Sequence, residues 1–244
     1  MSVEAAKTAG FCFGVNRAVD LVYGLLLQGE KVCTIGEIIH NPQVVRDLTR
    51  RGVLIADSPA DAPEGYVLVI RSHGVPPRVL GEIERRGLKT ADATCPYVSK
   101  IHKIVEKAAA KGRVVLIAGD AAHPEVEGIL GHAGGEGFVF SDEKELQDLL
   151  GRHPEWADKP VTMVAQTTFY ANLWEQCQNS FKKVCTNAEI FDTICNATAL
   201  RQAEAEALSK RVDLMIVIGG RQSSNTAKLR DVCAKHTDTI LVET

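Results

Sequence analysis

The sequence predicts an α/β protein of three pseudo-equivalent units, each with a parallel sheet flanked by helices. Short strands that are apolar throughout alternate with segments of helical periodicity, which is typical of parallel sheets covered by helices. In three places, a cysteine that precedes a predicted helix is followed 28 residues later by a polar cluster. The three spacings run from Cys12 to His40, from Cys95 to His123 and from Cys195 to Ser223. Equal spacings indicate one supersecondary unit used three times.

The composition restricts the class of protein. The 244 residues include 28 Lys and Arg and 31 Asp and Glu, for a formal charge of −3. This balance gives no electrostatic case for binding nucleic acid or an anionic membrane surface. No apolar run approaches the roughly 18 residues of a membrane span, and no signal sequence is evident, so we expect a cytoplasmic protein. Seven cysteines cannot all pair, and a reducing compartment favours metal or redox use over disulfides.

The first unit is expected at residues 1–95 and the second at residues 96–194. Helices are predicted where apolar residues recur with helical periodicity up to a glycine, and strands are predicted where apolar residues form a continuous run. In the first unit we predict helices at 15–28, 43–51 and 79–86 and strands at 32–36 and 66–70. In the second we predict helices at 98–111, 124–130, 142–150 and 174–183 and strands at 114–118 and 161–165.

The third unit, residues 195–244, is predicted to be cut short at its C-terminus. It has expected helices at 197–211 and 227–235 and strands at 214–218 and 239–242. In the earlier units a second polar cluster follows the first by 33 residues (His40 to His73) or 44 residues (His123 to Thr167). The matching cluster of the third unit would fall beyond Thr244. We therefore do not expect full activity from a chain of this length.

Polar residues stand directly after the predicted strands. Ligands of parallel α/β sheets bind outside the carboxyl ends of the strands, so three units of like polarity can converge on one pocket. The residues in these positions are His40, His73, His123, Thr167, Ser223, Ser224 and Asn225. All offer hydrogen-bond donors, and two or three of the histidines are expected to carry charge. Such a set fits a phosphorylated anion.

The three repeated cysteines are candidate metal ligands. Each precedes a helix, whose positive end favours the thiolate form. Three convergent thiolates without a fourth suit a four-iron, four-sulfur cluster with one iron free for substrate. Zinc held by three Cys and one His is the competing metal site, although no C-x-x-C pair is present. Buried structural thiols are the third alternative, and we assign that role to Cys33, Cys177, Cys185 and Cys233.

Glu125 is the only acid within these polar clusters. It lies in the first turn of a helix facing the expected pocket, where the macrodipole alone could explain a carboxylate. Alternatively, a carboxylic acid beside a cluster could deliver protons during a reduction. The remaining histidines, His102, His132, His153 and His236, lie off the repeated positions and are expected at the surface.

These motifs together resemble the 4-hydroxy-3-methylbut-2-enyl diphosphate reductases, the LytB-type iron–sulfur enzymes of the non-mevalonate isoprenoid pathway. The resemblance runs in order along nearly the whole chain. It rests on the segments 10–15, 40–42, 71–74, 92–96, 123–126, 166–168, 193–198 and 223–226. Two departures stand out: Ala122 replaces a usual glycine, and the chain stops before a C-terminal segment of the family.

The resemblance implies a trefoil of the three units around a central 4Fe-4S cluster held by Cys12, Cys95 and Cys195. It also implies that the substrate is dehydroxylated by two electrons and two protons to isopentenyl and dimethylallyl diphosphate. Glu125 matches the proton donor, with Thr167 and His123 in the proton path. The diphosphate-binding set would be His40, His73, His123, Thr167, Ser223, Ser224 and Asn225. Electrons would arrive from a ferredoxin, a flavodoxin or a related reductase.

Two rival functions use the same cysteines. A cluster-binding sensor or structural metalloprotein without turnover would need the three thiols but not Glu125, Thr167 or the histidines. A cluster-dependent dehydratase would turn over without consuming electrons.

Overall fold

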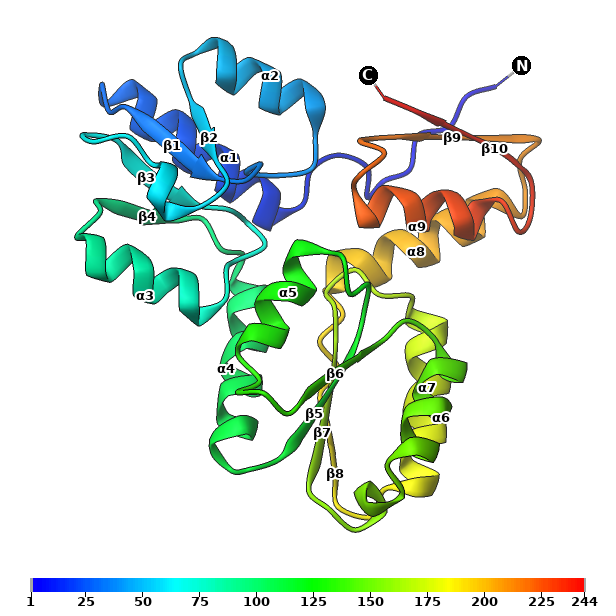
Figure 1. The fold of residues 1–244 in the computed structure, drawn as a ribbon. Helices are drawn as coiled ribbons and strands as arrows, with labels where there is room; N and C mark the ends of the chain where they lie inside the picture. The colour runs from blue at the N-terminus through cyan, green and yellow to red at the C-terminus, as the bar shows by residue number, and fades with distance from the viewer. Residues whose placement is uncertain (1, 244) are drawn as a thin grey trace.

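The computed structural model describes residues 2–243 and shows three lobes, each built on its own parallel sheet (Figure 1). The lobes follow one another along the chain and meet at a common centre. Within the described range, no helix has the length and apolar character needed to cross a membrane. The predicted α/β class with parallel sheets is confirmed. The three sheets lie within the predicted ranges 1–95, 96–194 and 195–244, whose exact limits stay a prediction and whose outermost residues, 1 and 244, lie outside the described part.

The first lobe has a four-stranded sheet of order β2-β1-β3-β4 in which all neighbours are parallel. Two apolar strands occupy its centre and two short strands its edges. Its elements are α1 (Phe13–Leu27), β1 (Val32–Ile35), α2 (Pro42–Arg50), β2 (Leu54–Ala56), η1 (Pro59–Asp61), β3 (Val67–Ile70), α3 (Pro77–Arg86) and β4 (Thr90–Asp92).

The second lobe repeats this topology, with a parallel sheet of order β6-β5-β7-β8. Because the order of strands is the same in both sheets, the repeat inferred from the cysteine spacing is also a repeat of topology. The elements are α4 (Pro96–Ala110), β5 (Val114–Ala118), α5 (Pro124–Gly131), β6 (Gly137–Phe140), α6 (Glu143–Arg152), η2 (Pro154–Ala157), β7 (Val161–Ala165), α7 (Ala171–Val184) and β8 (Ala188–Ile190).

Both faces of the second sheet are buried, because its side chains alternate between two helical layers. Val115 and Ile117 of β5 pack in the cluster formed with α4 and α5, whereas Leu116 packs with α6 and α7. Figure 1 shows these helix pairs on opposite sides of the sheet. This arrangement fixes the carboxyl ends of β5 and β7, which carry the polar residues toward the centre of the molecule.

The third lobe has a two-stranded parallel sheet, and its helices lie on one side of it (Figure 1). Its elements are α8 (Asn196–Ser209), β9 (Leu214–Ile218), α9 (Ser224–Cys233) and β10 (Asp238–Val242). Val217 faces the helices and is 8 % exposed, whereas Ile216 and Ile218 are 56 % and 65 % exposed. The predicted flanking of the sheets by helices is confirmed, and within residues 2–243 the helices of this lobe cover one face of its sheet.

The sequence patterns predicted the central strands but missed β2, β4, β6 and β8. These four strands have three or four residues each and lie at sheet edges, where they are partly exposed. β4 and β8 contain polar residues, and the apolar runs of β2 and β6 are too short for the sequence pattern to identify them as strands. Most helices also begin one to three residues earlier than predicted, because proline or a polar first turn precedes the periodic residues.

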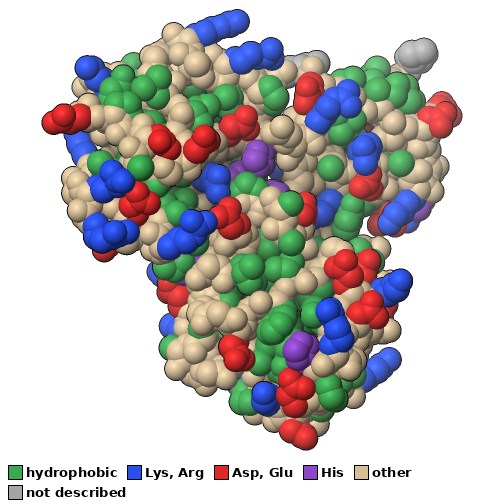
Figure 2. Space-filling view, viewed as in Figure 1, with side chains coloured by type: hydrophobic (Ala, Val, Ile, Leu, Met, Phe, Trp, Pro, Cys, Tyr) green, Lys and Arg blue, Asp and Glu red, His purple; other side chains and the backbone are tan. Residues whose placement is uncertain are grey.

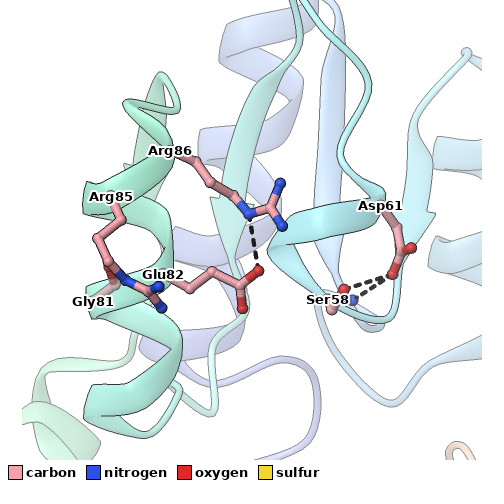
Figure 3. A network of polar contacts seen from close by, with 6 residues as sticks. All are labelled: Ser58, Asp61, Gly81, Glu82, Arg85 and Arg86. Atoms are coloured by element: carbon pink, nitrogen blue, oxygen red, sulfur yellow. Dashed lines mark hydrogen bonds and ion pairs between the residues drawn. The ribbon is translucent and has the colours of Figure 1, made fainter.

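The surface of the first lobe carries short-range polar contacts (Figure 3). Ser58 and Asp61 form a capping box at η1, in which the Asp61 carboxylate accepts from the Ser58 backbone N–H at 3.1 Å. On α3, Arg86 pairs with Glu82 one turn earlier at 2.9 Å. Exposed pairs of this type contribute roughly 0.3–0.5 kcal/mol each, so packing rather than surface charge holds the lobe together.

A buried guanidinium joins the amino ends of three neighbouring strands of the second sheet, β5, β7 and β8. Arg113 is 8 % exposed and donates to the Thr162 hydroxyl and the Val161 carbonyl at 2.8 Å each, and to the Asn187 carbonyl at 3.1 Å. We expect Arg113→Met to lower the free energy of unfolding by about 2–4 kcal/mol because it leaves buried acceptors without donors. Chemical denaturation measures this, with exposed Lys111→Met as the matched control, expected within about 0.5 kcal/mol of wild type. Equal effects in the two variants would contradict it.

Candidate functional site

The three repeated cysteines occupy the same position in the three lobes. Cys12, Cys95 and Cys195 are the N-cap residues of α1, α4 and α8, all with extended backbone dihedrals. Their side chains are partly exposed, and no side-chain hydrogen bond caps these helices. Since an N-cap side chain lies beside the free N–H groups of the first turn, each sulfur stands at the positive end of a helix.

Backbone hydrogen bonds tie two of these cysteines to the carboxyl ends of neighbouring strands. The Cys95 N–H donates to the Ser72 carbonyl just past β3, and the Cys195 N–H donates to the Thr167 carbonyl just past β7, both at 2.9 Å. The same hydrogen bond, from a cysteine N–H to the carbonyl just past a strand, thus appears twice. It brings each sulfur next to the polar residues that follow the strand.

Arginine side chains hold the loops before two of the cysteines. Arg17 of α1 donates to the carbonyls of Asp92 and Thr94, just before Cys95, at 3.1 Å each. Arg201 of α8 donates to the Gly10 carbonyl, just before Cys12, at 2.7 Å. The loop before Cys95 is therefore fixed by a helix of the first lobe, and the loop before Cys12 by a helix of the third lobe.

The sulfurs approach one another at the start of α1. A Cβ atom added at Gly14 would lie 2.5 Å from the Cys95 sulfur and 4.0 Å from the Cys12 sulfur, so the absent side chain leaves room for both. Burial raises the pKa of the Cys95 thiol, with the backbone N–H groups of Tyr97 and Val98 acting in the opposite direction. The N–H groups of the helix end thus act toward the Cys95 thiolate, and burial opposes them with the larger effect.

The geometry favours a large inorganic core over a single zinc ion. Within residues 2–243, His40, His73 and His123 each have a potential metal-ligand atom within 4.8 Å of the other two. The three cysteines do not form a group as close as this. Sulfur ligands of one tetrahedral zinc ion lie about 3.8 Å apart. Three thiols at three helix ends, with Gly14 leaving room beside the sulfurs of Cys12 and Cys95, fit a cluster of several metal atoms better.

The three histidines after the strands meet in one cluster. Their ring centroids are separated by 4.5 Å (His40 to His73), 5.6 Å (His40 to His123) and 5.3 Å (His73 to His123). Histidine side chains are visible in the hollow where the lobes meet (Figure 2). Both ring nitrogens of His40 and the Nδ1 of His73 are buried without a hydrogen-bond partner in the described residues, and Glu37 stands 3.5 Å from His40 without hydrogen-bond geometry. Such atoms are ready to bind a ligand.

The charges around the histidine cluster favour an anion as that ligand. Burial and the neighbouring histidines lower the pKa of His73, and burial followed by His40 lowers the pKa of His123 to about 4. These two rings are therefore neutral near pH 7 without a ligand, contrary to the expectation of charged histidines. Arg71 and Lys228 act on the cluster as nearby positive charges. A metal cation would be repelled by them, whereas an anion would be attracted.

Glu125 lies in the interior beside this cluster. It is 2 % exposed, and its two carboxylate oxygens accept from the backbone N–H and the hydroxyl of Thr167 at 2.6 and 2.7 Å. The His123 Nδ1 accepts from the Glu125 backbone N–H at 3.1 Å, so the neutral ring carries its proton on Nε2. Burial raises the pKa of Glu125, opposed by Thr167 and Lys228. The carboxyl group is thus held toward its protonated form.

The first turn of α9 brings the third lobe to the same centre. The Ser223 hydroxyl caps this helix by accepting from the Thr226 N–H, and Asn225 is half-buried beside it. The Ser224 hydroxyl lies 3.0 Å from the Thr168 hydroxyl of the second lobe and accepts from the Lys228 ammonium at 3.1 Å. A Cβ at Gly220 would lie 2.5 Å from the His40 carbonyl, so the turn before α9 also contacts the first lobe.

Two of the four histidines predicted at the surface are buried instead. His102 and His132 are 8 % and 7 % exposed and stack at 4.1 Å, with His132 bonded to Glu106 at 2.6 Å. A Cβ at Gly74 would lie 2.6 Å from His102, and Gly74 has φ +70°, a conformation that favours glycine. His102 therefore supports the turn that carries His73, a packing role that helical spacing alone did not indicate.

Sequence reasoning missed two cations at the site, Arg71 and Lys228. Lys228 lies over the rings of Phe169 and Tyr170 at 5.6 and 5.3 Å, and burial lowers its pKa to about 8. Its position four residues after Ser224 in a helix could have placed it on the same face. Arg71 directly follows β3, as the predicted site residues follow theirs.

Ala122, which stands where a glycine was expected, causes no strain. No non-glycine residue in the described range has a positive φ, so the turn before His123 tolerates the methyl group.

Comparisons with known proteins agree with this geometry. Residues 3–244 match the family described as LytB protein. The chain belongs to the LytB family. The 4-hydroxy-3-methylbut-2-enyl diphosphate reductase of Caldanaerobacter subterraneus is 40% identical over 240 residues, covering 97% of this chain and 81% of the relative. The Geobacter metallireducens enzyme of that name is 42% identical over 236 residues, covering 96% and 81%.

Solved structures of the LytB family have the same fold. The E-1-hydroxy-2-methyl-but-2-enyl-4-diphosphate reductase from Plasmodium falciparum superposes with a TM-score of 0.87 at 27% identity, over 96% of this chain and 73% of that one. A solved (E)-4-hydroxy-3-methyl-but-2-enyl diphosphate reductase, the terminal enzyme of the non-mevalonate pathway, superposes with 0.72 at 38% identity, over 98% and 84%. The predicted family and trefoil architecture are confirmed, and the predicted activity is the one these relatives are named for.

The space at Gly14 can be tested by filling it. We expect Gly14→Ala to reduce the iron bound per chain after anaerobic reconstitution, because the added methyl displaces the Cys95 sulfur. Gly24→Ala in the same helix is the control: no atom lies within 4 Å of its added Cβ, and alanine should stabilise the helix by about 0.5–1 kcal/mol. Metal analysis and chemical denaturation measure both effects. Full iron content in Gly14→Ala would show that the sulfurs do not converge there.

Proposed function

We propose that this protein reduces 4-hydroxy-3-methylbut-2-enyl diphosphate to isopentenyl and dimethylallyl diphosphate. The reaction removes the hydroxyl as water and consumes two electrons and two protons. The observation that carries the proposal is the buried Glu125 carboxyl group, bonded twice to Thr167, whose carbonyl in turn binds the Cys195 N–H. Thr167 therefore contacts both the proposed proton donor, Glu125, and a predicted metal ligand, Cys195.

Cys12, Cys95 and Cys195 would hold the cofactor, a 4Fe-4S cluster. When bound, it would pass electrons to the substrate from an external donor such as a ferredoxin or a flavodoxin. The support from this chain is the placement of three thiols at three helix N-termini, two of which, Cys12 and Cys95, lie beside Gly14. We keep the cytoplasmic location predicted from the sequence as part of the proposal.

Glu125 would supply the proton that leaves with the hydroxyl. Its raised pKa keeps the group protonated at higher pH than an ordinary carboxyl, which suits a general acid near neutral pH. Thr167 holds both oxygens and fixes the direction of the carboxyl, and His123 binds the backbone of Glu125 from the other side. Thr167 and His123 would thus form the proton path together with Glu125.

The diphosphate would bind among His40, His73, His123, Thr167, Ser223, Ser224 and Asn225. The orphaned ring nitrogens offer hydrogen bonds, and Arg71 and Lys228 supply positive charge. An arriving anion would raise the pKa of the histidines, and protonated rings bind it more strongly.

The proton donor can be tested with Glu125→Gln, which keeps the size and one acceptor of the side chain but has no acidic proton. In an anaerobic assay with the substrate and a dithionite-reduced dye, we expect dye oxidation to fall by 10²-fold or more. The cluster absorbance should not change. Glu175→Gln on α7 is the matched control, since that side chain is exposed and lies outside the site.

Other outcomes of this assay support the rival functions. Full activity in Glu125→Gln would remove Glu125 from the proton path. Cluster uptake with no dye oxidation by wild type would favour a sensor or structural metalloprotein. Turnover of the substrate without dye oxidation would favour a dehydratase.

The charge of Lys228 predicts a pH dependence of diphosphate binding. The ammonium is charged below its pKa of about 8 and neutral above it, so the dissociation constant for inorganic pyrophosphate should rise as pH passes about 8. Glu125, Asp120 and Asp231 face this ammonium and raise its pKa against the effect of burial.

Lys228 variants separate this charge from other titrating groups. Lys228→Met should weaken binding about tenfold at pH 7, the cost of one charged hydrogen bond, and lose the rise near pH 8. Lys228→Arg should retain binding and also lose the rise, because arginine stays charged. Calorimetry measures both constants. A rise near pH 8 that persists in Lys228→Arg would assign it to another group.

A further inference from the structure

A basic groove lies on the outer side of the two helices that Cys12 and Cys95 cap. It is a cavity of about 520 Å³ between α1 and α4. Thr94 and Pro96, the residues on either side of Cys95, line its floor. The groove therefore extends from the surface to the residues that flank one of the predicted cluster ligands.

Four cations line this groove: Arg17, Lys100, Lys103 and Lys107. The three lysines are exposed and spaced along one side of α4 over about 10 Å. None of the four forms an ion pair with a carboxylate of the described residues, and the single acid in the lining is Asp92. The groove is thus strongly positive on a chain whose formal charge is −3.

We propose that this groove is the docking surface for an acidic electron-carrier protein. The inference rests on the proposed function, which consumes two electrons that no residue of this chain can supply. Each docking event would pass one electron, with oxidation of the reduced carrier. Two such events supply the electron pair that replaces the broken C–O bond: one proton leaves with the hydroxyl as water, and the other is added to the allylic carbon. The structure places the docked carrier against the residues that flank Cys95.

The form of the groove fits a transient protein partner better than a small anion. A small anion is held by convergent donors on rigid, buried groups, as in the histidine cluster, whereas these lysines extend from a helix into solvent. Spread exposed charges steer an oppositely charged protein and raise its association rate while allowing fast release. Complexes of electron-transfer proteins are accordingly small and weak.

The experiment compares two double charge reversals in the iron-loaded protein, prepared without oxygen. Lys103→Glu with Lys107→Glu changes the groove, and Lys182→Glu with Lys183→Glu makes the same change of charge on α7. Figure 1 shows α7 on the opposite side of the second sheet from α4. Lys182 and Lys183 are exposed, and neither forms an ion pair in residues 2–243. Lys103→Gln with Lys107→Gln gives an intermediate, less disruptive change, and thermal denaturation checks folding.

We expect the groove reversal to lower ferredoxin-driven turnover at least tenfold at low salt and to weaken binding of oxidised ferredoxin, measured by calorimetry, to a similar extent. Turnover and ferredoxin binding of the Lys103→Gln, Lys107→Gln variant should lie between those of the groove reversal and wild type. Those of the Lys182→Glu, Lys183→Glu variant should match wild type. The difference should shrink in 0.5 M salt (about 4 Å of screening length). Turnover with a dithionite-reduced dye, which needs no docking surface, should be equal in all variants.

Equal ferredoxin binding in the groove and α7 variants, or a groove effect that is unchanged by salt, would overturn the docking surface. Loss of dye-driven turnover in the groove variants alone would also overturn it, since the lysines would then act on the site itself. Absence of dye-driven turnover in wild type would instead reject the proposed function, and the binding measurement would still decide whether the groove holds ferredoxin.

Discussion

The structure depends on the hydrogen bond between a cysteine N–H and the carbonyl just past a buried strand. In Cys95 to Ser72 and in Cys195 to Thr167 this bond fixes the start of a helix against the end of a sheet. The strand delivers polar residues to the centre, and the helix delivers a sulfur to the same place. One short contact therefore sets the distance between the predicted metal ligands and the predicted substrate ligands, and its repetition in two lobes gives the site its pseudo-symmetry.

The electrostatics of the centre follow from burial. Three histidines in contact with one another cannot all be charged, and burial keeps His73 and His123 neutral in the absence of a ligand. Near pH 7 the positive charge lies one layer outward, on Arg71 and Lys228. A centre arranged in this way would attract an anion, and without one its neutral rings do not repel each other strongly. The same burial holds Glu125 toward its protonated form, so a hydrogen-bonding anion site and an acid stand side by side.

Much of this arrangement could be read from the sequence because its signals are periodic. The spacing from Cys12 to His40 and its two repeats indicated the lobes, and continuous apolar runs located β5, β7 and β9 without error in their bounds. The edge strands were missed because they are only three or four residues long, and a run of that length does not separate a strand from a loop. The burial of His102 was missed because it depends on which helix faces pack together, and this is set by tertiary contacts. Lys228 was missed although its spacing of four residues from Ser224 indicates the same helix face. The charge state of the histidines was mistaken for the same reason, since desolvation depends on neighbours distant in sequence.

The arm before Cys12 is held by α8, through Arg201 to the Gly10 carbonyl and through Glu204 to Thr8. These contacts join residues separated by more than 190 positions. During translation at about 5–20 residues per second, Cys12 leaves the ribosome roughly 10–40 s before its anchoring helix exists. The first and second lobes can fold in that interval, since their sheets use only local segments. Loading of the proposed 4Fe-4S cluster would therefore be a late event of biogenesis, since it would follow synthesis of the last lobe and its closure onto the beginning of the polypeptide.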